Sequence, residues 1–416
     1  MTIIVHRING SEKMTKSFID MLKLFACGAA GKEFKAEGEI NIGEVRRLAI
    51  EQGVWQTVFA GISDTAKAGD ITVNSEFFGR FKKEVFISVR RSTARNEYTD
   101  KILLKSNLKY CVLKGQTVAR FYKYPDMRVS GDVDILIEPD KIQDWIELLK
   151  DADYLVGQVV KGKHHFEAKH PVGGLIEVHT RLYEKAVDEI LIKGLCDFSE
   201  PYINCDGIPS LGINDSLMFL TAHLLKHFLN GAAGLRQICD LLMHMQHYNS
   251  EIDWKKYNEL METLGFNGFI SAIKGIGSKY FGFDFEDSDE ILGDILLDDT
   301  EIGGNFGHND SEKGAFYYWF LRDRSDMPES GFDRYFTKQT RGGKLSLLFP
   351  NLKTMQKRYD GLSRYPFLLP AYWALRWVNI FCAIIGGRRT VSILPSAESE
   401  SVKRRRELTK KLGMMK

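Results

Sequence analysis

Residues 110–139 decide the fold of this chain, and they read YCVLKGQTVARFYKYPDMRVSGDVDILIEP. An apolar run comes first and ends in Lys114-Gly115, a pattern typical of a buried strand followed by a tight turn. A second apolar run follows Gly131. The segment therefore predicts a strand, a short helix, a loop and a second strand, over residues 110–113, 116–122, 123–131 and 132–137. This alternation indicates a mixed sheet with helices packed on it.

The sequence on either side extends the prediction. Residues 11–107 carry apolar side chains at helical spacing, and this pattern returns after Pro209, where Asn214 or Asp215 is a suitable N-cap. In between, we expect one helix and three further strands, over residues 140–150, 154–160, 164–169 and 175–180. The predicted fold class is α+β: a mixed β-sheet with flanking helices, plus N-terminal and C-terminal helical regions.

The predicted domains follow from these changes of pattern. We expect an N-terminal helical region over residues 1–108, a mixed-sheet domain over 109–208 and a C-terminal helical domain over 209–394. The basic residues 395–416 are expected to form a mobile tail, because they are rich in serine, glutamate and lysine. The acidic residues 286–299 are expected to belong to a loop-bearing insertion.

Composition narrows the class of protein. The chain has 416 residues, of which 44% are hydrophobic, enough for a large core and for two or three domains. Its 57 Lys and Arg nearly balance 55 Asp and Glu, so net charge indicates no specific nucleic-acid partner. Six cysteines without a CxxC pair favour neither a disulfide framework nor a cysteine zinc site. Residues 1–20 lack the apolar core of a secretory signal, so we expect a cytoplasmic protein.

The most apolar stretch is YPFLLPAYWALRWVNIFCAIIGG, residues 365–387. Arg376 lies inside it, and a charge at bilayer depth is costly, so a membrane-spanning helix is disfavoured. Nearby positive charge at Arg388, Arg389 and residues 403–406 suggests peripheral contact of residues 365–389 with the inner face of a membrane, or with a partner. Packing on the protein's own core is the simpler interpretation of the same pattern.

Acidic residues gather on two of the predicted strands. Because side chains alternate along a strand, Asp132 and Asp134 share one face in GDVDILIEP, while Val133 and Ile135 take the other. The same alternation in GGLIEVHT places Glu177 and His179 together and buries Ile176 and Val178. If the two strands are neighbours, three carboxylates meet, and they repel one another unless a cation neutralises them.

A cation held by these carboxylates predicts chemistry on phosphates. Mg²⁺ prefers carboxylate oxygens together with substrate phosphates, and such a site suits in-line displacement at phosphorus. Gly115 lets a triphosphate approach the backbone, the helix after it favours anions, and Lys114 and Arg128 add positive charge. The residues therefore indicate a site that holds a divalent metal, Mg²⁺ or Mn²⁺, and handles phosphates.

At these positions the chain resembles the nucleotidyltransferase superfamily, and in particular a bacterial family of uncharacterised nucleotidyltransferases. The family pattern is KG, then R near GDxD, then HH, then ExH, found here at Lys114-Gly115, Arg128, 131–134, His164-His165 and 177–179. The similarity extends to residues 224–227, Asp240, 349–350 and 367–370. In the wider superfamily a serine follows the glycine of the first turn, whereas Gln116 and Thr117 follow Gly115.

The resemblance implies a metal-dependent transfer of a nucleoside monophosphate from an NTP to an unknown acceptor, which is a small molecule, a saccharide or a protein. It implies that Asp132 and Asp134 bind the metal and that Glu177 is a ligand or a base. The implied phosphate-binding residues are Lys114, Gly115, Arg128, Gly131 and His179. Two other functions fit the pattern: a DxD glycosyltransferase that uses a sugar nucleotide, and an inactive nucleotide-binding or scaffold module at the membrane surface.

The histidines admit further interpretations. His164, His165, His170 and His179 lie near Glu177 in the predicted sheet and suit a hydrolytic zinc site as well. His223 and His227 are four residues apart on one helical face, but the HLLKH sequence lacks the glutamate of a zinc-protease motif. A role in packing, or at an interface between domains, is therefore the favoured interpretation of that pair.

Overall fold

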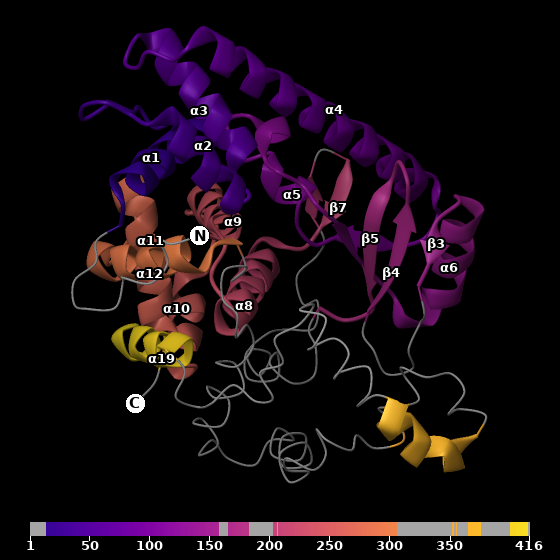
Figure 1. Ribbon diagram of the computed structural model, residues 1–416. Coiled ribbons are helices and arrows are strands. Elements are labelled where there is room, and N and C mark those ends of the chain that lie inside the picture. The colour runs from indigo at the N-terminus through magenta and orange to yellow at the C-terminus, as the bar shows by residue number, and fades with distance from the viewer. Residues whose placement is uncertain are drawn as a thin grey trace. The chain divides into compact units, whose positions relative to one another are not determined.

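The computed structural model describes residues 14–157, 165–182, 203–205, 207–305, 352, 355, 365–375 and 400–414. Residues 14–305 and 403–414 belong to one compact unit, and residues 365–375 belong to a second. The predicted α+β class is confirmed, because helices flank a mixed β-sheet in the first unit. Figure 1 shows the order of these elements along the chain.

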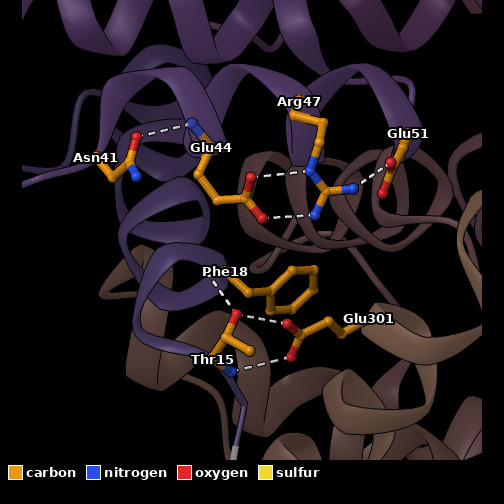
Figure 2. Close-up of polar contacts among 7 residues, drawn as sticks. All are labelled: Thr15, Phe18, Asn41, Glu44, Arg47, Glu51 and Glu301. Atoms are coloured by element: carbon orange, nitrogen blue, oxygen red, sulfur yellow. Dashed lines mark hydrogen bonds and ion pairs between the residues drawn. The ribbon is translucent and has the colours of Figure 1, made fainter. Parts of the chain in front are cut away.

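The described residues before the sheet are mainly helical, in agreement with the predicted helical region, and they form α1 (Lys16–Ala30), α2 (Ile42–Glu51), α3 (Trp55–Ala68) and α4 (Ser75–Lys105). Helix α1 begins at the N-cap Thr15, whose side chain accepts from the Phe18 N–H and donates to Glu301 (Figure 2). Helices α1 and α3 pack closely, since a Cβ on Gly28 would lie 2.0 Å from the Thr57 carbonyl oxygen. Only a glycine permits this approach of two helix backbones.

Within the described residues, the sheet has seven strands in the order β3-β4-β5-β2-β1-β7-β6. They are β1 (Tyr110–Val112), β2 (Val133–Ile137), β3 (Leu155–Val156), β4 (His165–His170), β5 (Gly174–His179), β6 (Ile203–Cys205) and β7 (Ile208–Ser210). Strands β2 and β5 are parallel neighbours, as are β1 and β7, and the other pairs are antiparallel. Short α5 (Gln116–Ala119) follows β1, and α6 (Ile142–Asp151) follows β2.

The two faces of the central strands differ. The packed face carries Val133, Ile135, Ile137, Ile176 and Val178, and it forms a core with Trp145 and Leu149 of α6 and Leu103 of α4. Figure 1 shows α4 running along the sheet. The site face carries Asp134, Leu136, Glu177 and His179, and Leu136 packs there with Cys111 and with Phe219 of the helix α8 (Ile213–Asn230). This division follows from the alternation of side chains along a strand.

The described residues after β7 are mainly helical, as predicted, with α8 followed by α9 (Leu235–His247), α10 (Trp254–Thr263), α11 (Asn267–Ile276), the π-turn Gly277–Phe281, α12 (Glu290–Gly303) and α19 (Glu400–Lys411). Helix α8 begins after Gly212, two residues before the predicted N-cap Asn214. The expectation of a loop-bearing insertion over 286–299 was wrong for most of these residues. Asp289 caps α12 there, and Leu296 and Leu297 are buried, so apolar burial outweighs the acidic composition.

The expectation of a mobile tail was also wrong for residues 400–414. They form α19 and the turn after it, and Leu408, Leu412 and Met414 are buried. The Arg405 guanidinium, which is 1% exposed, pairs with Asp299 of α12 at 3.1 Å and donates to the Phe228 carbonyl. A charge-rich composition suggests disorder, but apolar side chains every three or four residues are enough to dock such a helix.

The second unit is described over residues 365–375, where the 3-10 turn Pro366–Leu368 leads into a helical segment at 369–375. Phe367 is 76% exposed, and Tyr365 and Leu375 are each about half exposed. Within the part of the chain that the structure describes, no helix is both long and apolar enough to cross a membrane. Residues 376–389 of the apolar stretch lie outside the described residues.

Candidate nucleotidyltransferase site

Two neighbouring parallel strands bring the acidic side chains together. In the register of β2 and β5, Asp134 lies directly beside Glu177, and both side chains belong to the site face. One potential ligand atom each from Asp134, Glu177 and His179 lies within 4.8 Å of the other two. Among the described residues, this is the group of acidic, histidine or cysteine side chains that suits a metal ion. The geometry needed for a shared cation is therefore present at the centre of the sheet.

Asp134 is the most buried member of the group, at 2% exposed. Its Oδ2 lies 3.2 Å from the Lys114 Nζ, and its Oδ1 lies 3.2 Å from the His179 Nε2. Burial by itself raises the pKa of this carboxyl, but the Lys114 charge and the His179 hydrogen bond outweigh it and lower the pKa. The ionised form of Asp134 is therefore favoured by its contacts with Lys114 and His179.

Glu177 and His179 form a second contact on the same strand. The His179 Nε2 lies 3.6 Å from the Glu177 Oε2, and this contact with His179 is the main reason that the pKa of Glu177 is lowered. Burial lowers the pKa of His179, but the contacts with Asp134 and Glu177 outweigh burial and raise it. The two carboxylates thus favour the protonated form of His179.

Asp132 stands at the edge of this cluster, one residue before β2 begins. Its side chain is 30% exposed, and its Oδ2 lies 3.8 Å from the Lys114 Nζ. Lys114 therefore bridges Asp132 and Asp134, and its Nζ also lies 3.4 Å from the Nε2 of His223 on α8. Two of the three predicted carboxylates, Asp132 and Asp134, therefore meet at Lys114, whereas Glu177 joins the group through Asp134 and His179.

The turn after β1 has the backbone shape that its glycine allows. Gly115 has φ 81°, a conformation that residues with a Cβ rarely adopt, and its carbonyl accepts from the N–H groups of Val118 and Ala119. The helix that follows spans only Gln116–Ala119, shorter than the predicted 116–122. An anion site at the N-terminus of this helix is therefore weaker than expected, because so short a helix has only a small dipole.

A pocket lies beside the cluster. Its walls come from the two turns of the sheet, from α8 and from α9, and consist of Lys114, Gly115, Arg128, Gly131, Asp132, Leu220, His223, Arg236, Gln237 and Asp240. The first five belong to the motif that the sequence indicates. Arg236 and Gln237 were missed, although their spacing with Asp240 on one helical face is a pattern that sequence analysis can detect.

Arg128 is held by a carboxylate of α9. Its Nε and Nη2 donate to Asp240 at 2.7 and 2.6 Å, and the Tyr122 hydroxyl donates to the same carboxylate at 2.8 Å. Burial by itself lowers the pKa of Arg128, but Asp240 more than offsets this effect and raises it. Asp240 therefore neutralises the charge of this guanidinium. The pair lines the pocket and joins the loop before β2 to α9.

The other histidines have different neighbours. His170 stacks on Tyr98 with ring centroids 4.5 Å apart, and its Nδ1 accepts from the Gly173 N–H, a packing role. His165 lies with its ring 5.5 Å from that of His179, whereas His164 lies outside the described residues. On α8 the rings of His223 and His227 are 4.5 Å apart, and burial holds the pKa of His223 well below its usual value.

Comparison with known proteins identifies a family for this part of the chain. No curated protein and no solved structure shows significant similarity to this chain. A family model described as an uncharacterised nucleotidyltransferase matches residues 38–282, which span β1 to β7, α8 and α9. The C-terminal residues 349–350 and 367–370 lie beyond this match. Because the match covers more than half of its residues, the chain belongs to the uncharacterised nucleotidyltransferase family.

Proposed function

We propose that this protein is a metal-dependent nucleotidyltransferase that moves a nucleoside monophosphate from an NTP to an acceptor, which is a small molecule, a saccharide or a protein. The observation that carries the proposal is the placement of Asp134 directly beside Glu177 on parallel strands, with Asp132 at the adjoining pocket. Family membership gives the class of reaction. The carboxylates give the means of holding a metal and a triphosphate together.

The donor set fits a divalent cation. Asp132, Asp134 and Glu177 bring three negative charges to one place, and Lys114 and His179 already supply positive charge among them. Carboxylate oxygens are the ligands that Mg²⁺ and Mn²⁺ prefer, and both ions accept phosphate oxygens in their remaining positions. We assign Asp132, Asp134 and Glu177 as the ligands of this metal.

The proposed reaction is an in-line displacement. An acceptor oxygen forms a bond to the α-phosphorus as the bond to the bridging α–β oxygen breaks, pyrophosphate leaves, and the acceptor proton passes to a base or to water. When bound, Mg²⁺ or Mn²⁺ stabilises the charge on the attacking and leaving oxygens. Lys114, Gly115, Gly131 and Arg128 line the pocket in which we place the phosphates.

Glu177 fits the role of metal ligand better than that of base. Its contact with His179 lowers its pKa, and a lowered pKa makes a carboxylate a poorer acceptor for a hydroxyl proton. His179 orients Glu177 and Asp134 through the same nitrogen. We therefore assign His179 to positioning of the carboxylates and to contact with phosphate.

The test measures transfer of label from α-labelled NTPs with Mg²⁺ or Mn²⁺, using small hydroxyl compounds, saccharides and the protein itself as acceptors. Glu177→Gln should abolish transfer and weaken Mn²⁺ binding measured by calorimetry in the presence of a non-hydrolysable NTP. Glu167→Gln is the matched control, because Glu167 lies opposite Glu177 in the register of β4 and β5 but pairs with Lys169 at 3.0 Å. Equal metal binding and transfer by both variants and by the parent protein would contradict the proposal.

The same assay separates the alternative functions. UDP-sugars are included beside NTPs, and a metal-dependent preference for them would favour a glycosyltransferase. Binding of NTP without transfer to any acceptor would favour an inactive module.

Exposed Tyr365, Phe367 and Leu375 support peripheral membrane contact through residues 365–389, and co-sedimentation with vesicles that contain anionic lipid tests it. Triple replacement of these three residues by serine should release the protein from the vesicles.

A further inference from the structure

Two arginines line the pocket, and they differ in how their charge is balanced. Arg128 makes a bidentate pair with Asp240. Arg236, on α9, donates through Nη1 to the Val129 carbonyl at 2.9 Å, and no carboxylate of the described residues lies within ion-pair distance of it. Burial lowers the pKa of Arg236, and the nearby charge of Arg128 lowers it further. An anion in the pocket would relieve both effects.

The same pocket exposes backbone that an anion can approach closely. A Cβ built on Gly131 meets no atom within 4 Å, and one built on Gly115 has only the Asp132 carbonyl oxygen at that limit. Both glycines line the same pocket as Arg236 and Lys114. A polar pocket that joins two cationic side chains to open backbone is suited to a chain of phosphates, because guanidinium groups bind phosphate oxygens through directed hydrogen bonds.

We propose that Arg236 binds the terminal phosphates of the triphosphate. Arg236 is the cation that α9 contributes to the pocket. The identity of the ligand rests on the proposed function, whereas binding of a polyphosphate by Arg236 does not require transfer to occur. In this arrangement Asp240 neutralises Arg128 and leaves the Arg236 charge for the ligand. Binding of the substrate would thereby connect α9 to the turns of the sheet.

A purely structural role for Arg236 is the competing explanation, and the chain offers a matched control for it. Arg95 of α4 donates through Nη2 to the Ser130 carbonyl at 3.1 Å, one residue after the carbonyl that Arg236 binds. Burial lowers the pKa of Arg95 as well, but Arg95 does not line the pocket. If Arg236 only holds the loop before β2, Arg236→Gln and Arg95→Gln should behave alike.

The probe is inorganic tripolyphosphate, titrated into the full-length protein by calorimetry with a chelator present, so that metal-site chemistry does not contribute. Arg236→Gln should weaken tripolyphosphate binding by roughly 10- to 100-fold, the usual effect of losing a charged hydrogen-bond donor. Arg236→Lys should lose less, since it keeps the charge. Arg95→Gln should bind as the parent protein does, and the salt dependence of affinity should become weaker only in Arg236→Gln.

Each outcome decides between the interpretations. Absence of tripolyphosphate binding by the parent protein, or equal losses in Arg236→Gln and Arg95→Gln, would overturn the inference. Thermal unfolding of each variant shows whether the fold survives, and if Arg236→Gln does not fold, the comparison of Arg236→Lys with Arg95→Lys replaces it. Loss of transfer in Glu177→Gln with unchanged tripolyphosphate affinity in Arg236→Gln would refute this inference alone. Unchanged transfer in Glu177→Gln, together with weakened tripolyphosphate binding in Arg236→Gln, would refute the proposed function alone.

Discussion

The two faces of strands β2 and β5 use the same backbone for opposite purposes. On the packed face, Val133, Ile135 and Val178 are buried among the apolar side chains of α4 and α6. On the site face, Asp134 is equally buried, but its neighbours are Lys114, His179 and Glu177. The packed face fixes the position of the strands, and the site face depends on that position for its geometry. Replacement of adjacent residues on one strand should therefore affect different properties, transfer activity on the site face and stability on the packed face.

The largest expected effect is on the site face. Asp134→Asn removes the charge of the central carboxylate while preserving its volume, so transfer should fall by about 1,000-fold or more, about 4 kcal/mol of transition-state stabilisation. The free energy of unfolding should change by about 1 kcal/mol at most, since Asp132 still pairs with Lys114. Steady-state transfer assays and urea denaturation measure the two quantities. Retention of most of the transfer activity would remove Asp134 from the site.

The neighbouring residue should show the opposite pattern. Ile135 is fully buried on the packed face, and Ile135→Ala should lower the free energy of unfolding by about 2–5 kcal/mol through lost apolar contact and an internal cavity. Mn²⁺ affinity per folded molecule should stay close to that of the parent protein. Urea denaturation and metal titration at low temperature test this pair of expectations. A loss of metal affinity larger than the loss of folded protein would show that the two faces are not independent.

The helices behind the site face should make the stability of the protein sensitive to acid. His244 of α9 is 2% exposed and donates to the Ile213 carbonyl at 3.0 Å, and burial lowers its pKa to about 4. The unfolded chain takes up this proton near pH 6.5, so stability should fall as pH drops from 6.5 towards 4, by up to about 3 kcal/mol from this group. His244→Gln should flatten that part of the pH profile, measured by urea denaturation at several pH values. An unchanged slope would show that His244 is not the group responsible.

The smallest expected effect lies at the start of α1, outside the packed core of the sheet and the residues of the site. Thr15→Ala removes the capping hydroxyl of α1 and the hydrogen bond that this hydroxyl donates to Glu301 of α12 (Figure 2), whereas the bond from the Thr15 backbone N–H remains, so the free energy of unfolding should fall by about 1 kcal/mol. Transfer and tripolyphosphate binding should not change. Thr15→Ser is the control, because it keeps the capping hydroxyl. A change in activity greater than the change in stability would link these helices to the site.

Much of this fold could be predicted because its periodicity is local. The helical spacing of residues 11–107 yields α1 to α4, and alternation in GDVDILIEP and GGLIEVHT correctly places the acidic side chains opposite the apolar ones. Strands β6 and β7 were missed because each has only three residues, and Pro209 lies inside β7, where a proline argues against a strand. The helices α12 and α19 were missed because charge-rich composition was given more weight than their apolar positions.

The sequence by itself determined which side chains share a face, because the period of a strand or helix is a property of adjacent residues. Only the tertiary structure decided that Asp134 lies beside Glu177, that Lys114 bridges two aspartates, and that Asp240 neutralises Arg128. It also brought Arg236 into the same pocket as Gly115, although more than a hundred residues separate them. Such contacts depend on which apolar surfaces bury one another across the whole unit, and no local pattern of residues carries that information.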